Sequence, residues 1–203
     1  MSILASSPGG EKLFRGNTFF ADMEDNLKKI LMAIAFRDFR DEEYFVAKEI
    51  FKKAGIGVIT ASSQKGTAIG SQGGDTNVEL SLQDINVADF DAIVFIGGQG
   101  AAKHIDDSQF HRVAQEAIKQ NKILAAICIA PAILAKAGVL RGKKATVWSS
   151  AFDKSAVKIL QENGAIYQSE LVVQDGNIVT ANGPPAVKDF GKAILSAFSH
   201  LKI

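Results

Sequence analysis

The stretch ILAAICIAPAILAKAG, residues Ile123 to Gly138, joins a continuous apolar run to an alanine-rich helical pattern. Its first five residues have the length and apolar character of a strand that is buried on both faces. Pro131 suits the first turn of a helix, and Gly138 is a typical helix stop. The stretch therefore predicts a strand, a tight turn and a helix in direct succession, which is the building unit of parallel α/β sheets.

The same alternation continues on both sides of this stretch. Strand patterns lie at residues 30–36, 57–62, 90–98 and 143–148, helical patterns at 41–54, 108–121, 153–164 and 186–201, and a hairpin pattern at 169–182 around Asp175–Gly176. This order predicts one α/β domain over residues 29–203, with a mostly parallel sheet between layers of helices. Ligands of such sheets bind beyond the carboxyl ends of the strands.

Residues 1–28 differ from the rest of the chain. SSPGG (6–10) is typical of flexible chain, and the segment after it shows only a short helical pattern. We predict an N-terminal extension, or arm, in which Phe19 and Phe20 pack either on the domain or on a second subunit.

The composition excludes several classes of protein. A net charge of +1 gives no electrostatic basis for binding nucleic acid or an anionic membrane, and no apolar run has membrane-spanning length. The single cysteine cannot form an intramolecular disulfide, which favours a reducing cytoplasm. The one cysteine and three histidines lack zinc-ligand spacing, and no nucleotide-binding glycine motif occurs. We therefore expect a cytoplasmic protein without a metal or cofactor.

Cys128 is the first candidate for chemistry, because it falls in the turn between the predicted strand and helix. Small neighbours, Ala126 and Ala130, suit a sharp bend of the nucleophile-elbow type. A thiol at the start of a helix faces the positive end of the helix dipole, which predicts a lowered pKa. The alternative is that Cys128 only fills space, since free cysteines are often buried.

Glu43 is the second candidate. It shares a helical row with Ala47, Ile50 and Ala54, whereas Glu42 shares one with Val46, Glu49 and Lys53. Glu43 is therefore expected to point toward the buried side, where a carboxyl group needs a partner or a proton. It would act as a general acid or base, or donate a hydrogen bond to a thiolate. The alternative is a first-turn acid that only complements the helix dipole.

The glycine pair Gly97–Gly98 is the third candidate, because it ends the predicted strand at 90–98. Glycine permits close approach of backbone N–H groups to a ligand. The N–H groups of Gly98 and Ile129 are placed to form an oxyanion hole beside the Cys128 sulfur. The alternative is an ordinary tight turn.

Together these features resemble the ThiJ/PfpI superfamily, which includes deglycases and intracellular proteases. The resemblance runs from Lys29 to the C-terminus, through ILMAIAFRDFRDEEYFVAKEIFKKAG, DAIVFIGGQGA, ILAAICIAPAILAKAGVLRGKKAT and VVQDGNIVTANGP. It implies a flavodoxin-like α/β/α sandwich, similar to the class I glutamine amidotransferases. It also implies that Cys128 is the nucleophile, Glu43 its acid/base partner, and Gly98 and Ile129 the backbone donors. A homodimer or larger homo-oligomer is expected.

The sequence departs from the family pattern at two positions. The proteases carry histidine directly after the cysteine, where this chain has Ile129, and the place of the deglycase-branch histidine is Trp148. We expect Gly97, Trp148 and His104 near the pocket. The resemblance then implies action on small reactive carbonyl compounds, of the glyoxalase or deglycase type. The alternatives are a redox-sensing or chaperone-like protein and, disfavoured by the missing histidine, a cysteine protease or amidase.

Overall fold

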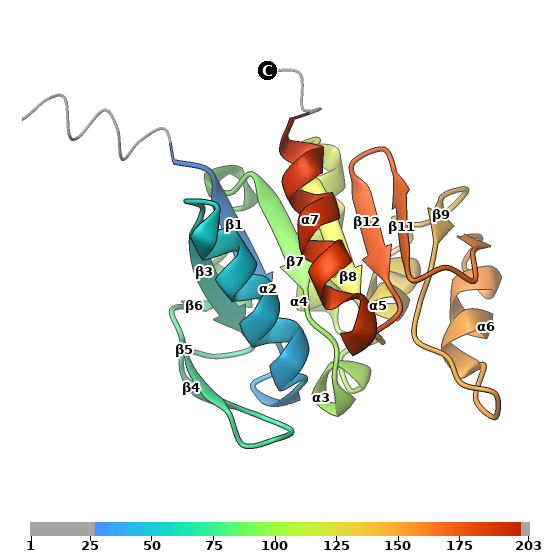
Figure 1. Ribbon diagram of the computed structural model, residues 1–203, viewed down its shortest axis with the longest axis horizontal. Helices are drawn as coiled ribbons and strands as arrows, with labels where there is room; N and C mark the ends of the chain where they lie inside the picture. The colour runs from blue at the N-terminus through green and yellow to red at the C-terminus, as the bar shows by residue number, and fades with distance from the viewer. Residues whose placement is uncertain (1–26, 200–203) are drawn as a thin grey trace, which may run out of the picture.

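The computed structural model describes residues 27–199, drawn in colour in Figure 1. Phe19, Phe20 and all but the last two residues of the predicted arm lie outside the described residues.

A seven-stranded sheet forms the centre of the molecule, with the strand order β11-β12-β8-β7-β1-β3-β6 (Figure 1). All neighbouring strands pair in parallel except β11, which runs antiparallel to β12. The predicted mostly parallel sheet and the hairpin at 169–182 are thus confirmed. The strands are β1 (Lys29–Ala33), β3 (Gly57–Ser62), β6 (Leu80–Ser81), β7 (Ala92–Phe95), β8 (Ile123–Ile127), β11 (Val172–Asp175) and β12 (Ile178–Ala181).

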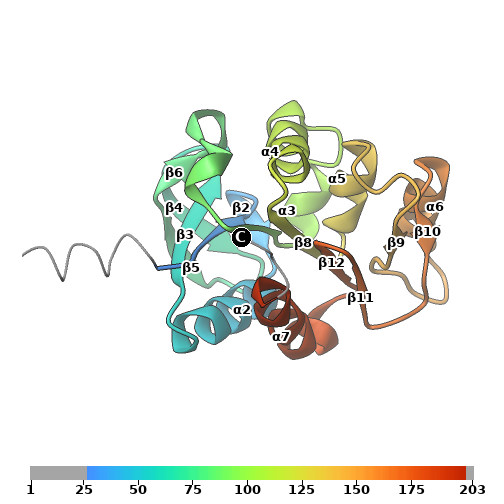
Figure 2. The same cartoon turned by 90° about the horizontal axis from the view of Figure 1, so that it is seen from above.

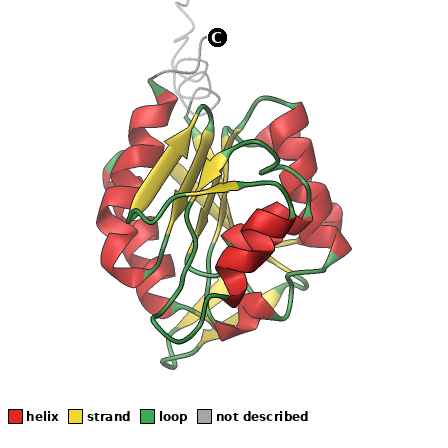
Figure 3. Ribbon diagram, turned by 90° about the vertical axis from the view of Figure 1, so that its right-hand side faces the viewer, coloured by secondary structure: helices red, strands yellow, loops and turns green. Residues whose placement is uncertain are grey.

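Helices cover both faces of this sheet, as Figures 2 and 3 show. α2 (Asp41–Lys53) and α7 (Val187–Phe198) lie side by side on one face. The opposite face carries α4 (Ser108–Lys119), α5 (Pro131–Lys136) and α6 (Ser155–Glu162). The three-layer α/β/α sandwich predicted from the sequence is therefore confirmed.

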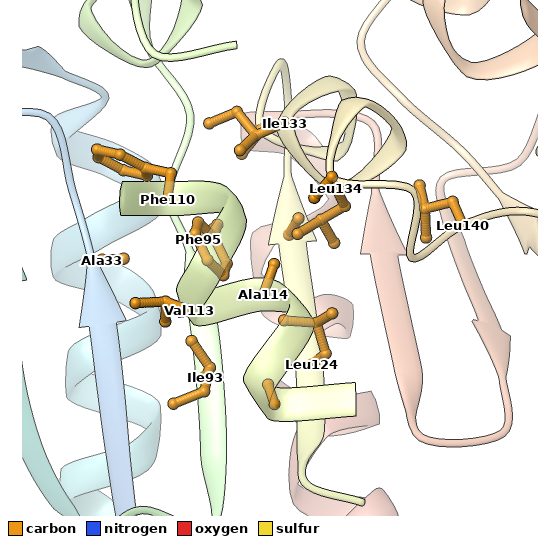
Figure 4. Close-up of a cluster of buried hydrophobic side chains, with 14 of the residues drawn as sticks. Ala33, Ile93, Phe95, Phe110, Val113, Ala114, Leu124, Ile133, Leu134 and Leu140 are labelled. Atoms are coloured by element: carbon orange, nitrogen blue, oxygen red, sulfur yellow. The ribbon is translucent and has the colours of Figure 1, made fainter. Parts of the chain in front are cut away.

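Two apolar clusters fill the spaces between the sheet and its helices, because the side chains of each strand alternate between the faces. In β7, Ile93 and Phe95 belong to one cluster, whereas Ala92 and Val94 belong to the other. Figure 4 shows the first cluster, in which α4 contributes Phe110 against the sheet. The central strands are covered on both faces, which explains why their sequences read as continuous apolar runs.

Two small sheets flank the central one. One consists of β2 (Arg37–Phe39), β4 (Gly66–Gly70) and β5 (Asp75–Val78), and the other of β9 (Lys144–Ala145) and β10 (Ile166–Tyr167). The strand predicted at 143–148 is therefore reduced to two residues and lies outside the central sheet. The physical reason is that the antiparallel β11 occupies the edge beside β12, so this segment pairs with β10 instead.

Three short 3-10 helices, at Leu82–Asp84, Val87–Asp89 and Pro184–Ala186, and the four-residue helix α3 (Gln99–Ala102) complete the fold. The strands β8, β7 and β1 are neighbours, so their carboxyl ends meet at one edge. Cys128 follows β8, the pair Gly97–Gly98 follows β7, and the loop that leads to Glu43 follows β1. The topology thus brings the three sequence candidates to the same edge of the sheet.

Candidate active site

Cys128 occupies a strained turn between β8 and α5. Its φ angle is 62°, in the left-handed region that side chains other than glycine rarely adopt. Such a conformation costs about 1 kcal/mol or more and persists only where its surroundings fix it. Here the backbone N–H of Cys128 donates to the carbonyl of Ala181 at 2.9 Å, and its carbonyl accepts from the N–H of Trp148 at 2.8 Å. The predicted sharp bend is therefore present.

Glu43 lies in the first turn of α2 with its side chain fully buried. Its Oε2 accepts a hydrogen bond of 3.0 Å from the N–H of Gly97, whereas Oε1 is buried without a hydrogen bond of ordinary geometry among the described residues. Glu42, by contrast, is exposed and pairs with Arg40 at 3.0 Å. The inward orientation predicted for Glu43 is confirmed.

Gly97 is the reason that these two side chains can meet. A Cβ atom at this position would lie 2.6 Å from Cβ of Cys128 and 2.8 Å from Oε2 of Glu43. Both distances are far shorter than a van der Waals contact. The absence of a side chain at Gly97 therefore lets the thiol and the carboxyl group share one small space.

Gly98 is required for a different reason. Its φ angle is 109°, and a Cβ atom there would lie 2.5 Å from the carbonyl oxygen of Asp38 and 2.6 Å from the nitrogen of Arg40. The strand end thus packs directly on the backbone that leads into α2. The backbone N–H groups of Gly98 and Ile129 act on the Cys128 thiol as hydrogen-bond donors and lower its pKa. Two backbone donors thus lie beside the sulfur, as the donors of an oxyanion hole do.

The pKa values of Glu43 and Cys128 are both raised by burial, and each group also affects the pKa of the other. Burial raises the pKa of Glu43 to about 7, against the lowering effects of the Cys128 thiol, the Gly97 N–H group and the charge of Arg40. Burial also raises the pKa of Cys128 to about 12, and the negative charge of Glu43 adds to this, against the hydrogen bonds from Gly98 and Ile129. Near neutral pH the pair is therefore a thiol beside a carboxyl group that exchanges its proton readily.

The lowered thiol pKa that the helix dipole predicted is wrong. The helix α5 has only six residues, so its dipole is weak, and the sulfur is buried beside a carboxyl group of its own sign of charge. Desolvation and repulsion outweigh the two backbone donors. In consequence, the structure favours activation of the thiol by proton transfer to a base over a preformed thiolate.

A cavity of about 490 Å³ opens beside the sulfur. Its lining is largely apolar, with Arg40 and Asp153 as its charged residues. The lining residues are Arg40, Gly98, Gln99, Ala102, Ile105, Cys128, Ile129, Trp148, Asp153, Ser155, Ile159 and Pro184. Trp148 thus takes the place predicted for it at the pocket, whereas Gly97, also expected there, is not part of this lining.

His104 does not line this cavity, and the prediction that it lies at the pocket is wrong. Its Nδ1 pairs with Oδ2 of Asp107 at 2.8 Å, and its ring stacks on Phe110 at a centroid distance of 4.5 Å. Asp107 caps α4 by accepting from the N–H of Gln109, so it holds the imidazole at that helix. His111 bonds to the carbonyl of Ile105, and among the described residues no histidine is paired with Cys128.

Four polar lining residues were not found from the sequence: Arg40, Gln99, Asp153 and Ser155. Arg40 carries a usable signal, because it lies between the carboxyl end of β1 and Glu43. Gln99 likewise follows the glycine pair directly. Asp153 and Ser155 carry no such signal, since they lie just before α6 and at its first residue, and not at the end of a central strand.

Residues 27–199 contain neither a cluster of metal ligands nor a membrane-spanning helix. No three histidine, cysteine or acidic side chains in this part of the chain lie together as metal ligands would. No helix there has the length and apolar character needed to cross a membrane.

Comparison with known proteins agrees with this geometry. Residues 28–197 match the model of the DJ-1/PfpI family. An uncharacterized protein of Methanocaldococcus jannaschii is 38% identical over 179 residues, which cover 87% of this chain and 86% of that protein. Protein/nucleic acid deglycase 2 of Escherichia coli is 29% identical over 170 residues, covering 83% and 96%. The crystal structure of a ThiJ/PfpI domain protein from Brachyspira murdochii superposes with a TM-score of 0.82 at 36% identity, covering 87% and 99% of the two chains.

Proposed function

The chain belongs to the DJ-1/PfpI family, and from that membership and the geometry above we propose that it converts small 2-oxoaldehydes to 2-hydroxy acids through Cys128. The observation that carries the proposal is the pairing of a fully buried Glu43 with the strained Cys128 beside one cavity. The deglycase name of the Escherichia coli relative supports action on carbonyl compounds.

The first step adds the thiol to the aldehyde. As Sγ forms a bond to the aldehyde carbon, its proton passes to Glu43, whose Oε1 has no other hydrogen bond among the described residues. The aldehyde oxygen gains negative charge, which the N–H groups of Gly98 and Ile129 stabilise. Glu43 then returns the proton to this oxygen, and a hemithioacetal results.

The second step moves hydrogen within the substrate. Glu43, with its pKa near 7, removes the proton from the former aldehyde carbon and returns it to the neighbouring ketone carbon. The hydroxyl proton of the first carbon passes to the neighbouring ketone oxygen, so the first carbon is oxidised to a thioester and the second is reduced to an alcohol. Water then cleaves the carbon–sulfur bond, which releases the hydroxy acid and restores the thiol. The sum is addition of one water molecule to the oxoaldehyde, so no external oxidant or reductant is consumed.

Methylglyoxal is the simplest probe of this proposal, and lactate is the expected product. The purified protein should form lactate at a rate that saturates with methylglyoxal, and Cys128→Ser should reduce kcat/KM at least a hundredfold. A Lys103→Gln variant serves as the matched control, because Lys103 is exposed and pairs with Asp38 outside the cavity. Equal rates for wild type and Cys128→Ser would contradict the proposal.

A second candidate function is oxidation of Cys128 by peroxide, favoured by the convergence of two N–H donors on the sulfur. Two equivalents of hydrogen peroxide would oxidise the thiol to a sulfinate and release two water molecules. The donors and a protonated Glu43 would bind the sulfinate oxygens. Intact mass after mild peroxide treatment should then show a gain of two oxygen atoms that Cys128→Ser lacks and Glu43→Gln reduces.

Peptidase activity is not proposed, because a cysteine protease needs a base such as histidine at the thiol, and the described histidines bond elsewhere. The expected homodimer and cytoplasmic location stay predictions. Light scattering of the purified chain tests the first, and fractionation of cells tests the second.

A further inference from the structure

The Cys128 cavity is larger than methylglyoxal requires, and it is lined by charged residues that methylglyoxal does not need. Its volume of about 490 Å³ falls in the range of roughly 300–1,000 Å³ that is typical of sites for drug-sized ligands. A three-carbon oxoaldehyde without charge would leave most of this space and both charged lining residues, Arg40 and Asp153, without a contact. The cavity therefore suits a longer substrate with a polar end.

Arg40 is the cationic residue of this lining, and the fold fixes its position. Its backbone N–H donates to the carbonyl of Gly97 at 3.0 Å, and its carbonyl accepts from the N–H of Tyr44 at 3.1 Å. It is thus attached both to the strand end beside Cys128 and to the helix that carries Glu43. The positive charge also acts on Glu43, whose pKa it lowers.

The guanidinium group retains hydrogen-bonding capacity. Its Nε and Nη2 atoms both bond to Oε2 of Glu42, at 3.1 Å and 3.0 Å. This edge of the group is exposed to solvent, so the ion pair is weak. Nη1 has no partner among residues 27–199, and Nη2 keeps a second N–H beside its bond to Glu42, so this end of the group matches the two oxygens of a carboxylate.

We propose that Arg40 selects substrates that carry a carboxylate, and that the substrate class of this site is 2-oxoaldehydes with an acidic group at the end away from the aldehyde. This inference rests on the proposed function. A carboxylate fits better than a phosphate, because Glu42 already pairs with Arg40 and Asp153 adds a negative charge to the lining. The cavity lining contains no second cation to balance a dianion.

Two five-carbon probes of nearly equal shape test this selection. 4,5-Dioxopentanoate carries a carboxylate where 2-oxopentanal carries a methyl group, and both present the same oxoaldehyde to Cys128. The measured quantity is the ratio of kcat/KM for the anionic probe to that for the neutral probe. Because both probes use the same thiol and the same base, the ratio cancels changes in the reactivity of the Cys128–Glu43 pair.

Wild type should favour the anionic probe by about tenfold or more at low salt, and Arg40→Gln should reduce the ratio to near one. Arg40→Lys should retain part of the preference, because it keeps the charge but loses the planar edge. Lys103→Gln removes a nearby exposed charge outside the cavity and should leave the ratio unchanged. The wild-type ratio should also fall between 20 mM and 500 mM NaCl, which tests the charge without any substitution.

The outcomes separate the two proposals. Turnover of both probes with a wild-type ratio near one, or with the same ratio in Arg40→Gln, would overturn the selection and leave the proposed function standing. Absence of turnover for both probes would overturn the proposed function, and the selection would fall with it.

Discussion

Two buried carboxyl groups stand two residues apart in the first turn of α2, and their surroundings differ. The Asp41 carboxylate accepts hydrogen bonds from the N–H groups of Gln72 and Gly74, each at 2.8 Å, and from the Ser71 hydroxyl at 3.4 Å. Both of its oxygens are thus satisfied by the turn between β4 and β5. The Glu43 carboxyl group accepts one bond at Oε2 and leaves Oε1 without one.

The difference shows that burial alone does not prepare an acid for catalysis. The Asp41 carboxyl group has backbone donors at both oxygens, so it fastens the β4–β5 turn to the helix. Glu43 has a single backbone donor and an apolar surrounding, which brings its pKa to about 7. Its carboxyl group interacts with the thiol of Cys128, which lines the cavity. The four predictions below test this contrast, in order of decreasing effect.

The first prediction concerns turnover. Glu43→Gln should reduce kcat/KM for methylglyoxal by roughly 10²–10⁴-fold, because the amide keeps the shape of the side chain but cannot carry a proton between sulfur and substrate. Asp41→Asn, measured as rate per folded molecule, should remain within about threefold of wild type. Comparable losses in both variants would mean that the two carboxyl groups differ less than their hydrogen bonds suggest.

The second prediction concerns the pH dependence of stability. The pKa of Glu43 is raised from 4.5 to about 7 on folding, so the folded state holds a proton that the unfolded state releases. The contribution of Glu43 to the free energy of unfolding should therefore be greatest below pH 4.5. It should fall by about 3 kcal/mol in total as the pH rises through 7.

Urea unfolding of wild type and Glu43→Gln at several pH values between 5 and 8 isolates this contribution. The variant has no titrating group at position 43, so its advantage over wild type should grow as pH rises. Curves that stay parallel across this range would show that Glu43 titrates near its ordinary value.

The positions of Glu43 and Cys128 follow from local sequence patterns. Helical periodicity placed Glu43 on the buried face, and the elbow pattern placed Cys128 at the end of a strand. Both are local properties, and the parallel order of β8, β7 and β1 then forces them to one edge. The fold class, the family and the inward direction of Glu43 could therefore be predicted.

The protonation of the site could not be predicted in the same way. The sequence pattern showed a thiol at a helix start, but desolvation and the charge of Glu43 depend on packing between distant segments. Likewise, the partners of Asp41 come from residues 71–74, about 30 positions away. The sequence predicts His104 at the pocket because it follows the glycine loop. In the structure its ring is instead bound to Asp107 and stacked on Phe110. The contacts of Cys128 and Asp41 are long-range and leave no periodic trace in the sequence, whereas those of His104 are local.

The third prediction concerns the structural member of the pair. Asp41→Asn should lower the free energy of unfolding by about 2 kcal/mol, because the amide loses charge-assisted bonds and turns an N–H donor toward backbone donors. Urea unfolding at pH 7 measures this loss. Glu43→Gln at the same pH should be as stable as wild type or more stable, since it removes a buried charge. A destabilised Glu43→Gln together with a stable Asp41→Asn would reverse the assignment of the two roles.

The smallest effect is expected in the alkylation of Cys128 by iodoacetamide at pH 8, which reports the thiolate fraction. Wild type should react slowly, because burial and the charge of Glu43 raise the thiol pKa to about 12. Glu43→Gln removes that charge and should react about three- to tenfold faster, although it has lost turnover. Asp41→Asn should react at the wild-type rate. Faster alkylation together with lost turnover would separate the two effects of Glu43, because its charge opposes ionisation of the sulfur while its proton transfer enables the reaction. Slower alkylation in Glu43→Gln would mean that the carboxylate favours the thiolate, and the contrast between the two acids would then rest on Oε1 alone.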